Sequence, residues 1–216
     1  MHISEYFNYN FLFDSHCHLN EQGYDKDRST LISEAIKNKV EMILDVSVDL
    51  ETSGKSIEIS KEFQGKVKSW IGLDPELFIP GSSIFKTENL NLSKSSLKFF
   101  QDGLKKLYES NKDYIIGIGE CGLDYYWLNS GLEKNEIPKN TVSMSKDFQK
   151  DIFTLQLELA GKLNLPLSVH SRGAEEDCLT VVKNFPGTSG IFHSYGGDYE
   201  TAKKVLDSGW GLGVNG

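Results

Sequence analysis

The sequence lacks the features that define several large classes of protein. Its three cysteines, Cys17, Cys121 and Cys178, are an odd number at wide spacings, which argues against a disulfide framework and indicates a reducing compartment. No apolar run approaches the roughly 18 residues of a membrane-spanning helix. Residues 1–13 have no basic residue before their apolar part and no small-residue cleavage site, so we expect no secretory signal. We therefore expect a cytoplasmic protein that does not contact membranes.

Basic residues are also scarce relative to acidic ones. The 216 residues include 23 Lys and Arg against 31 Asp and Glu, for a formal net charge of −8. This balance argues against a broad basic surface that binds nucleic acid along its length. The hydrophobic share of 38% and the charged share of 25% are those of an ordinary globular protein. The length predicts one domain, and nothing in the sequence indicates an obligate protein partner.

Two kinds of segment alternate along the chain. Short apolar or β-branched runs alternate with stretches such as 147–163, where apolar residues recur at steps of three and four, as on one face of a helix. This alternation predicts right-handed βαβ units on a parallel sheet, and both an open doubly wound sheet and a (β/α) barrel fit it. The predicted strands are 11–14, 40–46, 66–72, 114–119, 165–170, 190–193 and 209–214.

Two stretches do not fit this alternation. Residues 127–146 are polar and contain Gly, Pro and several Asn and Ser, so we expect a loop insertion there, of the kind that forms a functional lid or a disordered segment. Residues 74–92 form a second loose stretch. Both follow a predicted strand, and α/β proteins place their sites at the carboxyl ends of strands.

Four of the five histidines lie at or just beyond the ends of predicted strands. His16 and His18 follow the first strand, while His170 and His193 close the strands 165–170 and 190–193. In an extended segment residues i and i+2 point to the same side. His16 and His18 can therefore present two imidazoles to one cation, and neutral imidazole suits zinc and other transition metals.

Glu120 is the carboxylate that would complete such a site. It directly follows the strand 114–119 in a glycine-rich segment, and a carboxylate with two oxygens can bridge two metals. A single histidine at a strand end is more often a structural residue than a ligand. Four histidines and one carboxylate at four strand ends nevertheless favour a metal site over packing. Cys17 and Cys121 lie beside these residues, but their strand parity points them away, which predicts a packing role.

Four segments together resemble a known family. FDSHCHLN, GIGECGLDYY, LPLSVHSR and HSYGG occur in this order and are similar to the TatD family of metal-dependent deoxyribonucleases, which belongs to the amidohydrolase-like superfamily. The resemblance runs from about residue 11 to the end of the sequence. It implies a TIM-type (β/α) barrel with two divalent ions, Mg²⁺ or Mn²⁺ in function, with Zn²⁺ as an alternative. One ion would be held by His16, His18 and Glu120, and the other by Glu120, His170 and His193.

The resemblance also implies a function. It predicts hydrolysis of phosphodiester bonds in DNA, as a 3′-to-5′ exonuclease acting on single strands or ends, with Glu120 at the catalytic centre. Arg172 and Tyr125 are candidate substrate contacts, since a guanidinium fits a phosphate and an aromatic ring stacks on a base. Alternatively, Arg172 is a surface or helix-start residue, and Tyr125 has only a packing role. Two rival functions are a hydrolase of the same superfamily that cleaves an ester, lactone or amide, and a truncated, catalytically impaired protein that binds metal.

Three departures from the family pattern bear on these expectations. Asp74-Pro75-Glu76 stands where many members have His-Pro-His, and residues 170–174, HSRGA, lack one acidic position. The residues after His193 supply one helix and the strand 209–214, which leaves no room for the eighth strand and its metal-binding Asp. We therefore expect a single barrel domain over 1–216 that lacks strand eight and the C-terminal helices. The ion on His16 and His18 should bind more weakly than the other.

Overall fold

The computed structural model describes residues 11–82, 84 and 93–214. Within these ranges seven parallel strands form one sheet, in which each strand pairs with the next one along the chain. Every predicted strand overlaps one of them, so the expected order of elements is confirmed. The strands are β1 (Leu12–Cys17), β2 (Val40–Val46), β3 (Val67–Ile71), β4 (Ile115–Gly122), β5 (Leu167–His170), β6 (Gly190–Phe192) and β7 (Gly211–Leu212).

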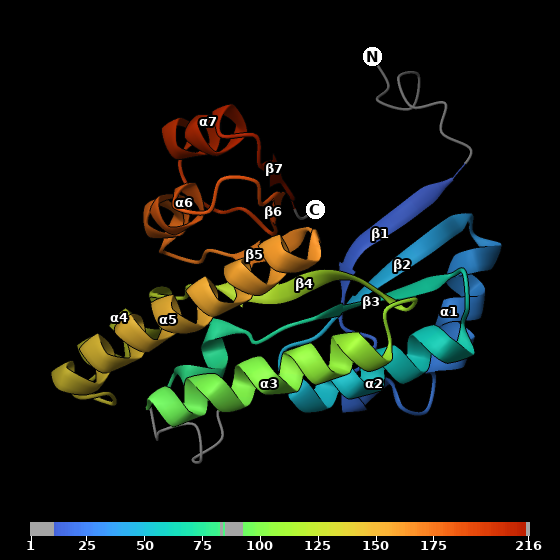
Figure 1. The fold of residues 1–216 in the computed structure, drawn as a ribbon, viewed down its shortest axis with the longest axis horizontal. Helices are drawn as coiled ribbons and strands as arrows, with labels where there is room; N and C mark the ends of the chain where they lie inside the picture. The colour runs from blue at the N-terminus through green and yellow to red at the C-terminus, as the bar shows by residue number, and fades with distance from the viewer. Residues whose placement is uncertain (1–10, 83, 85–92, 215–216) are drawn as a thin grey trace.

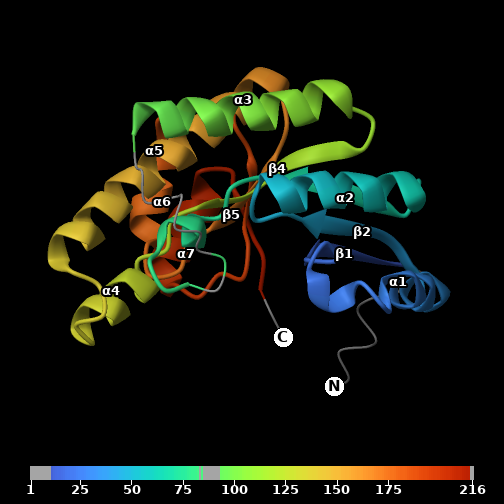
Figure 2. The ribbon, with the colours of Figure 1, turned by 90° about the horizontal axis from the view of Figure 1, so that it is seen from below.

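Helices connect the strands and cover the outside of the sheet (Figure 1). Helix α2 packs on β3 and helix α5 on β4, with α3 lying against both helices (Figure 2). None of the helices in the described ranges has the length and apolar character needed to cross a bilayer. The helices are α1 (Arg28–Lys37), α2 (Leu50–Glu62), α3 (Lys94–Ser110), α4 (Tyr126–Glu133), α5 (Lys139–Leu163), α6 (Glu175–Lys183) and α7 (Tyr199–Asp207), with 3₁₀ turns η2 (Gln22–Tyr24) and η3 (Pro75–Phe78).

The sheet curls, so that its two edges face each other. Residues of β1, including Leu12 and Phe13, line a cavity of about 410 Å³ together with Gly213 and Val214, which directly follow β7. This is the arrangement of a (β/α) barrel, and it confirms the predicted fold class. Within the described residues β1 and β7 are the two edges, and no eighth strand lies between them.

The loop expected over 127–146 is wrong. Helix α4 and the first turns of α5 occupy this region. The prediction failed because the polar residues lie on the outer faces of these helices, while the apolar ones are spaced for burial. Leu128, Ile137 and Val142 are all buried in the main core, and Pro138 directly precedes α5, where its fixed φ fits a helix start.

The second loose stretch, 74–92, contains the turn η3 near its start. Asp74 caps this turn by accepting a hydrogen bond from the Glu76 backbone N–H at 2.6 Å. Leu77 and Phe78 are buried against the core, so the turn is anchored at the end of β3. Residues 83 and 85–92 lie outside the described residues.

The core is distributed unevenly around the sheet. The larger apolar cluster joins β3–β6 to α5 and α6, whereas a small one, with Ile32 and Ile43 at its centre, lies under α1. All four residues of β5 are buried, but the first four residues of β1 are exposed. Strand β5 is therefore enclosed by the core, whereas most of β1 is exposed to solvent.

Candidate metal centre

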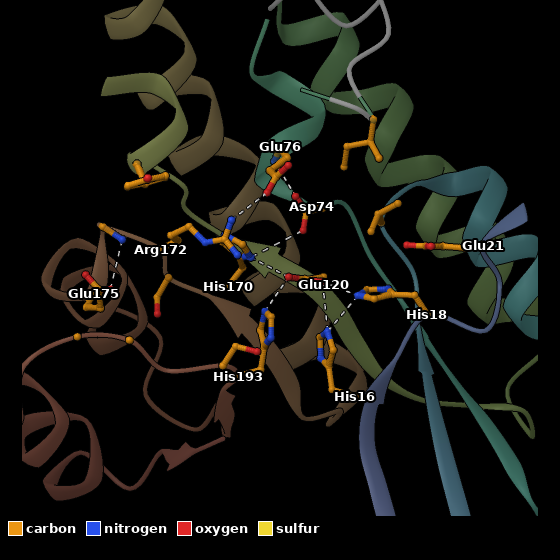
Figure 3. Close-up of a pocket in the computed structure, with 18 residues that line it drawn as sticks. His16, His18, Glu21, Asp74, Glu76, Glu120, His170, Arg172, Glu175 and His193 are labelled. Atoms are coloured by element: carbon orange, nitrogen blue, oxygen red, sulfur yellow. Dashed lines mark hydrogen bonds and ion pairs between the residues drawn. The ribbon is translucent and has the colours of Figure 1, made fainter. Parts of the chain in front are cut away.

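Glu120 lies at the point where the four strand-end histidines meet (Figure 3). Its Oε1 is 2.7 Å from His170 Nδ1 and 2.7 Å from His193 Nε2. Its Oε2 is 3.4 Å from His16 Nε2 and 3.5 Å from His18 Nε2. The structure thus brings together all five residues that the sequence nominated as metal ligands, with one pair of imidazoles on each carboxylate oxygen.

The backbone places Glu120 by an irregularity at the end of β4. The register between β4 and β5 shifts between Ile118 and Cys121, and such a bulge turns a side chain out of the regular pleat. The Glu120 N–H donates to the Ser47 carbonyl, just beyond β2, at 2.7 Å. Gly122 allows β5 to come close, because a Cβ there would lie 2.1 Å from the His170 carbonyl oxygen.

His16 and His18 point their Nε2 atoms at each other and at Glu120. His18 Nδ1 donates to the Val46 carbonyl at 2.8 Å, so in the neutral ring the lone pair is on Nε2. The Nε2 atoms of the two rings are 3.3 Å apart, and His16 Nδ1 lies 3.3 Å from the Ser168 hydroxyl. His18 is thus fixed with its unprotonated nitrogen toward the centre, as metal-binding histidines are, and His16 directs its Nε2 to the same point.

His170 is oriented by a second carboxylate. Its Nε2 hydrogen bonds to Asp124 Oδ2 at 3.0 Å, and Asp124 is fully buried. Burial alone would lower the pKa of His170, but the hydrogen bonds to Asp124 and Glu120 outweigh it and raise this pKa well above its usual value. Asp124 also accepts a hydrogen bond from the Trp127 N–H at 3.0 Å, which ties the start of α4 to the centre.

His193 is buried with both ring nitrogens lacking an aligned hydrogen bond. Its Nε2 is close to Glu120, but the carboxylate oxygen is not in line with an N–H on the ring. Burial lowers the pKa of His193 and favours the neutral ring. The ring stacks on that of His16, with centroids 4.0 Å apart. Since buried polar atoms are normally paired, an orphaned neutral imidazole beside a carboxylate fits a metal ligand.

Glu120 itself is held as a carboxylate. Burial would raise its pKa, but the nearby imidazoles of His16, His170 and His193 keep this pKa well below its usual value. Asp74 behaves in the opposite way, because burial and the nearby charge of Glu120 raise the pKa of its carboxyl group well above the usual range.

Sequence reasoning assigned no ligand role to three carboxylates near the centre. Asp74 Oδ2 is 4.0 Å from His170 Nδ1, and Glu76 forms a group with Asp124 and His170 whose ligand atoms all lie within 4.8 Å of one another. Asp74 lies just beyond the end of β3, and the other site residues lie at or just beyond the ends of their strands, so the same signal could have found it. Asp124 lies within the quoted segment GIGECGLDYY, but its contact with β5 cannot be read from the sequence.

A cavity of about 790 Å³ surrounds these residues, and it is strongly acidic. Arg172 is the arginine among the described lining residues, and its Nη1 lies 3.7 Å from Glu76 Oε1. So many carboxylates in one cavity repel each other unless cations are present. The lining carboxylates are Glu21, Asp74, Glu76, Glu120 and Glu175.

The donor set fits divalent cations. His16, His18 and Glu120 form one group of atoms within 4.8 Å of one another, and Glu120, His170 and His193 form another. Imidazole and carboxylate ligands suit zinc and manganese, and carboxylates suit magnesium. The two groups share Glu120, which is the arrangement that a bridging carboxylate requires.

The two nominated substrate contacts lie in different environments. Arg172 is half-exposed at the rim of the cavity. Tyr125 is buried, and its hydroxyl donates to Asp177 Oδ2 at 3.0 Å. The structure does not bring Tyr125 to the cavity, whose lining includes the next residue, Tyr126, instead.

The two cysteines beside the ligands point away, as predicted. Cys17 Sγ contacts the Leu44 carbonyl at 3.5 Å and Cys121 Sγ the Ser168 carbonyl at 3.4 Å. Neither residue lines the cavity. Cys121 is fully buried and Cys17 is partly buried, so both have the packing role that their strand parity indicated.

Comparison with protein families gives a match over almost the whole chain. Residues 13–216 match the family described as TatD related DNase. The chain is 32% identical over 198 residues to a putative deoxyribonuclease TATDN1 homolog of Enterocytozoon bieneusi, covering 92% of this chain and 64% of that protein. It is 30% identical to an uncharacterized metal-dependent hydrolase, YabD, of Bacillus subtilis, covering 95% and 69%.

Solved structures share the fold. The TatD homolog YJJV of Escherichia coli superposes with a TM-score of 0.72 at 19% identity, covering 93% of this chain and 66% of that one. The phosphotriesterase homology protein of the same organism gives 0.56 at 10% identity, covering 94% and 68%. These likenesses establish the barrel architecture, and the chain spans about two thirds of the length of the proteins it matches.

Proposed function

The chain belongs to the TatD-related DNase family of metal-dependent hydrolases, and we propose that its cavity hydrolyses phosphodiester bonds of DNA. The observation that carries this proposal is the convergence of four strand-end histidines on the two oxygens of the buried Glu120. We propose a 3′-to-5′ exonuclease that acts on single strands or ends, as the family resemblance implies.

Two divalent cations would occupy the centre, Mg²⁺ or Mn²⁺ in function. His16 and His18 would hold one and His170 and His193 the other, with Glu120 shared between them. Bound divalent cations supply Lewis-acid polarisation of a phosphate and lower the pKa of water. They also offset the negative charge of the lining carboxylates. Without bound cations, these carboxylates would repel an anionic DNA backbone from the cavity.

The protein's own residues divide the remaining work. Glu120 fixes the relative positions of both pairs of histidines, and Asp124 holds the ring of His170 in one orientation. Arg172 is free to turn from Glu76 to a phosphate oxygen, because it is half-exposed and their separation of 3.7 Å is long for an ion pair. Tyr126 lies exposed at the rim, where its ring can contact a base.

The test compares two substrates with and without Mn²⁺. We expect metal-dependent hydrolysis of bis(p-nitrophenyl) phosphate, and progressive shortening of a 5′-labelled single-stranded oligonucleotide from its 3′ end. Glu120→Gln should slow both by roughly 10²–10³-fold, whereas Glu109→Gln, at an exposed position of α3, should leave both unchanged. Loss of the label as a mononucleotide at the first step would contradict the polarity.

The rival within the superfamily is hydrolysis of an ester, lactone or amide. The barrel does not separate these chemistries, because one fold hosts many reactions. p-Nitrophenyl acetate assayed beside the two phosphodiesters decides between them. Cleavage of the ester with no cleavage of either diester would replace the nuclease by an esterase. Tight Mn²⁺ binding with no turnover of any substrate would indicate a catalytically impaired metal-binding protein.

A further inference from the structure

A second cavity, of about 600 Å³, adjoins the metal cavity. Glu76 and Arg172 line both cavities, so this ion pair lies at the boundary between them (Figure 3). Beyond the boundary the second cavity is lined by α4 and the residues that follow it, and by the residues after η3. Its volume is that of a pocket for one small organic group.

Two consecutive aromatic residues at the start of α4 face the two cavities. Tyr126 lines the metal cavity and Trp127 lines the second one. Their rings meet edge to face, with centroids 5.0 Å apart. Tyr126 is 53% exposed and Trp127 is 41% exposed. Neighbouring exposed aromatic rings at the mouth of a site offer flat apolar surfaces to a ligand.

The remaining walls of the second cavity suit a flat, partly polar group. Ile79, Pro80 and Ile137 supply apolar surface beside that of Trp127. Lys134 and Arg172 supply positive charge, and Glu76 and Glu136 supply carboxylates. A nucleobase has an apolar face and polar edges, and its adjoining phosphates are negative. The composition of these walls matches that combination.

Asp124 couples this aromatic surface to the metal centre. One oxygen of its carboxylate accepts a hydrogen bond from the Trp127 N–H, and the other hydrogen bonds to His170, each at 3.0 Å. The backbone of Trp127 is therefore held at a fixed position relative to the ring of His170. This is the property that a substrate subsite needs.

We propose that the second cavity is a nucleobase subsite for single-stranded DNA, with Trp127 as the stacking surface and Lys134 as a phosphate contact. The proposal rests on the proposed phosphodiesterase function. The strand would pass the boundary formed by Glu76 and Arg172, with its scissile phosphate in the metal cavity. A base can enter a closed pocket when it is unstacked, so the subsite selects single strands over duplex.

The experiment measures binding and turnover separately. Binding of a fluorescein-labelled octathymidylate is followed by anisotropy in Ca²⁺, and hydrolysis of bis(p-nitrophenyl) phosphate is followed in Mn²⁺. The small diester fits within the metal cavity and does not need the subsite. Trp127→Leu should raise the Kd for the oligonucleotide by about tenfold or more, and by a factor at least five times larger than its effect on the small diester.

A second variant guards against a folding defect. Ser130→Phe adds bulk to the same cavity from a half-exposed position on α4, and it should weaken oligonucleotide binding to a similar degree. The matched control is Phe99→Leu, which removes a 64% exposed ring from α3 and should change neither measurement. Lys134→Gln should reduce the slope of log Kd against log salt by about 0.7, the value for one phosphate contact on a single strand.

Each outcome supports or overturns the subsite. If Trp127→Leu and Ser130→Phe weaken the oligonucleotide no more than they slow the small diester, the subsite proposal is overturned. Equally tight binding of a duplex of the same length, or no binding of the oligonucleotide by the parent protein, also overturns it. A parent protein that binds the oligonucleotide through Trp127 but hydrolyses neither diester would refute the proposed function instead.

Discussion

The two pairs of histidines that meet at Glu120 are held by very different parts of the sheet. The side chains of His16 and His18, at the end of β1, are 17% and 28% exposed, against 7% and 9% for His170 and His193. Strand β5 lies between β4 and β6, whereas β1 pairs with β2 alone among the described strands. Among the described strands, the β5–β6 half of the candidate centre is therefore supported by neighbouring strands on both sides, whereas the β1 half is supported on one side.

The partners behind the histidines differ in the same direction. His170 hydrogen bonds to the carboxylate of Asp124, while His18 donates to the backbone carbonyl of Val46. That carbonyl also accepts a hydrogen bond from the Asn20 side chain at 2.8 Å. A carboxylate is the stronger acceptor and increases the basicity of the ring it holds. We expect the β5–β6 half to bind its cation more tightly, as the family comparison of the sequence also predicted.

The largest effect should come from the residue that both halves share. Glu120→Gln keeps the shape of the side chain but removes the charge between the two pairs of histidines. We expect activity on either diester to fall by roughly 10²–10³-fold, the loss typical of removing one preorganised charge-stabilising group. Replacement of any one histidine should cost less, because it affects one ion.

The measurement is kcat/KM at saturating Mn²⁺, with Glu109→Gln as the control for an exposed carboxylate on α3. A Glu120→Gln protein with near-parental activity and two bound ions would remove this residue from the centre of the mechanism. Such a result would also mean that Glu120 does not link the two pairs of histidines functionally.

The two halves of the candidate centre should differ in their affinity for metal. We expect calorimetric titration with Mn²⁺ to show two steps that differ by tenfold or more in Kd, about 1.4 kcal/mol. His16→Asn should remove the weaker step and keep the tighter one, whereas His193→Asn should remove the tighter step. Two steps of equal affinity, or the reverse assignment in the variants, would contradict the difference inferred from burial.

The convergence of the candidate ligands could be predicted from the sequence because their positions follow from strand geometry. The carboxyl ends of parallel strands meet at one edge of a sheet, so histidines at three strand ends and Glu120 at a fourth must converge there. The His16–Cys17–His18 spacing then fixes which residues share a side. These arguments need no knowledge of long-range packing, and the structure brings His16, His18, Glu120, His170 and His193 together.

The features that the sequence did not indicate depend on contacts between distant segments. Residues 127–146 look polar because the buried apolar positions of α4 and of the first turns of α5 are few. Which of Tyr125 and Tyr126 faces the cavity depends on the rotation of α4 about its axis, which the Asp124 side chain helps to fix. The approach of Asp74 to His170 requires the turn η3.

A smaller loss is expected when the partner of the buried half is weakened. Asp124→Asn keeps an oxygen that can accept the Trp127 N–H but removes the charge that faces His170. We expect the tighter Mn²⁺ affinity to fall about 10–100-fold, the usual effect of changing a hydrogen-bond partner behind a metal ligand. The Kd for Mn²⁺ in the weaker binding step should not change. Asp102→Asn, an exposed residue of α3, serves as the control.

The smallest effect should appear in the backbone of β1. Without metal we expect amides of β1 to exchange with solvent faster than those of β5, because local opening is easiest where few buried contacts hold a strand. Mn²⁺ between His16, His18 and Glu120 would link the end of β1 to β4. At ten times the Kd of the weaker step, opening of β1 should then be suppressed about tenfold. Hydrogen–deuterium exchange over 12–17 measures this change, and His16→Asn should abolish it. If β1 is as slow as β5 in the absence of metal, the exposed half is already rigid, and the difference between the two halves must come from their hydrogen-bond partners alone.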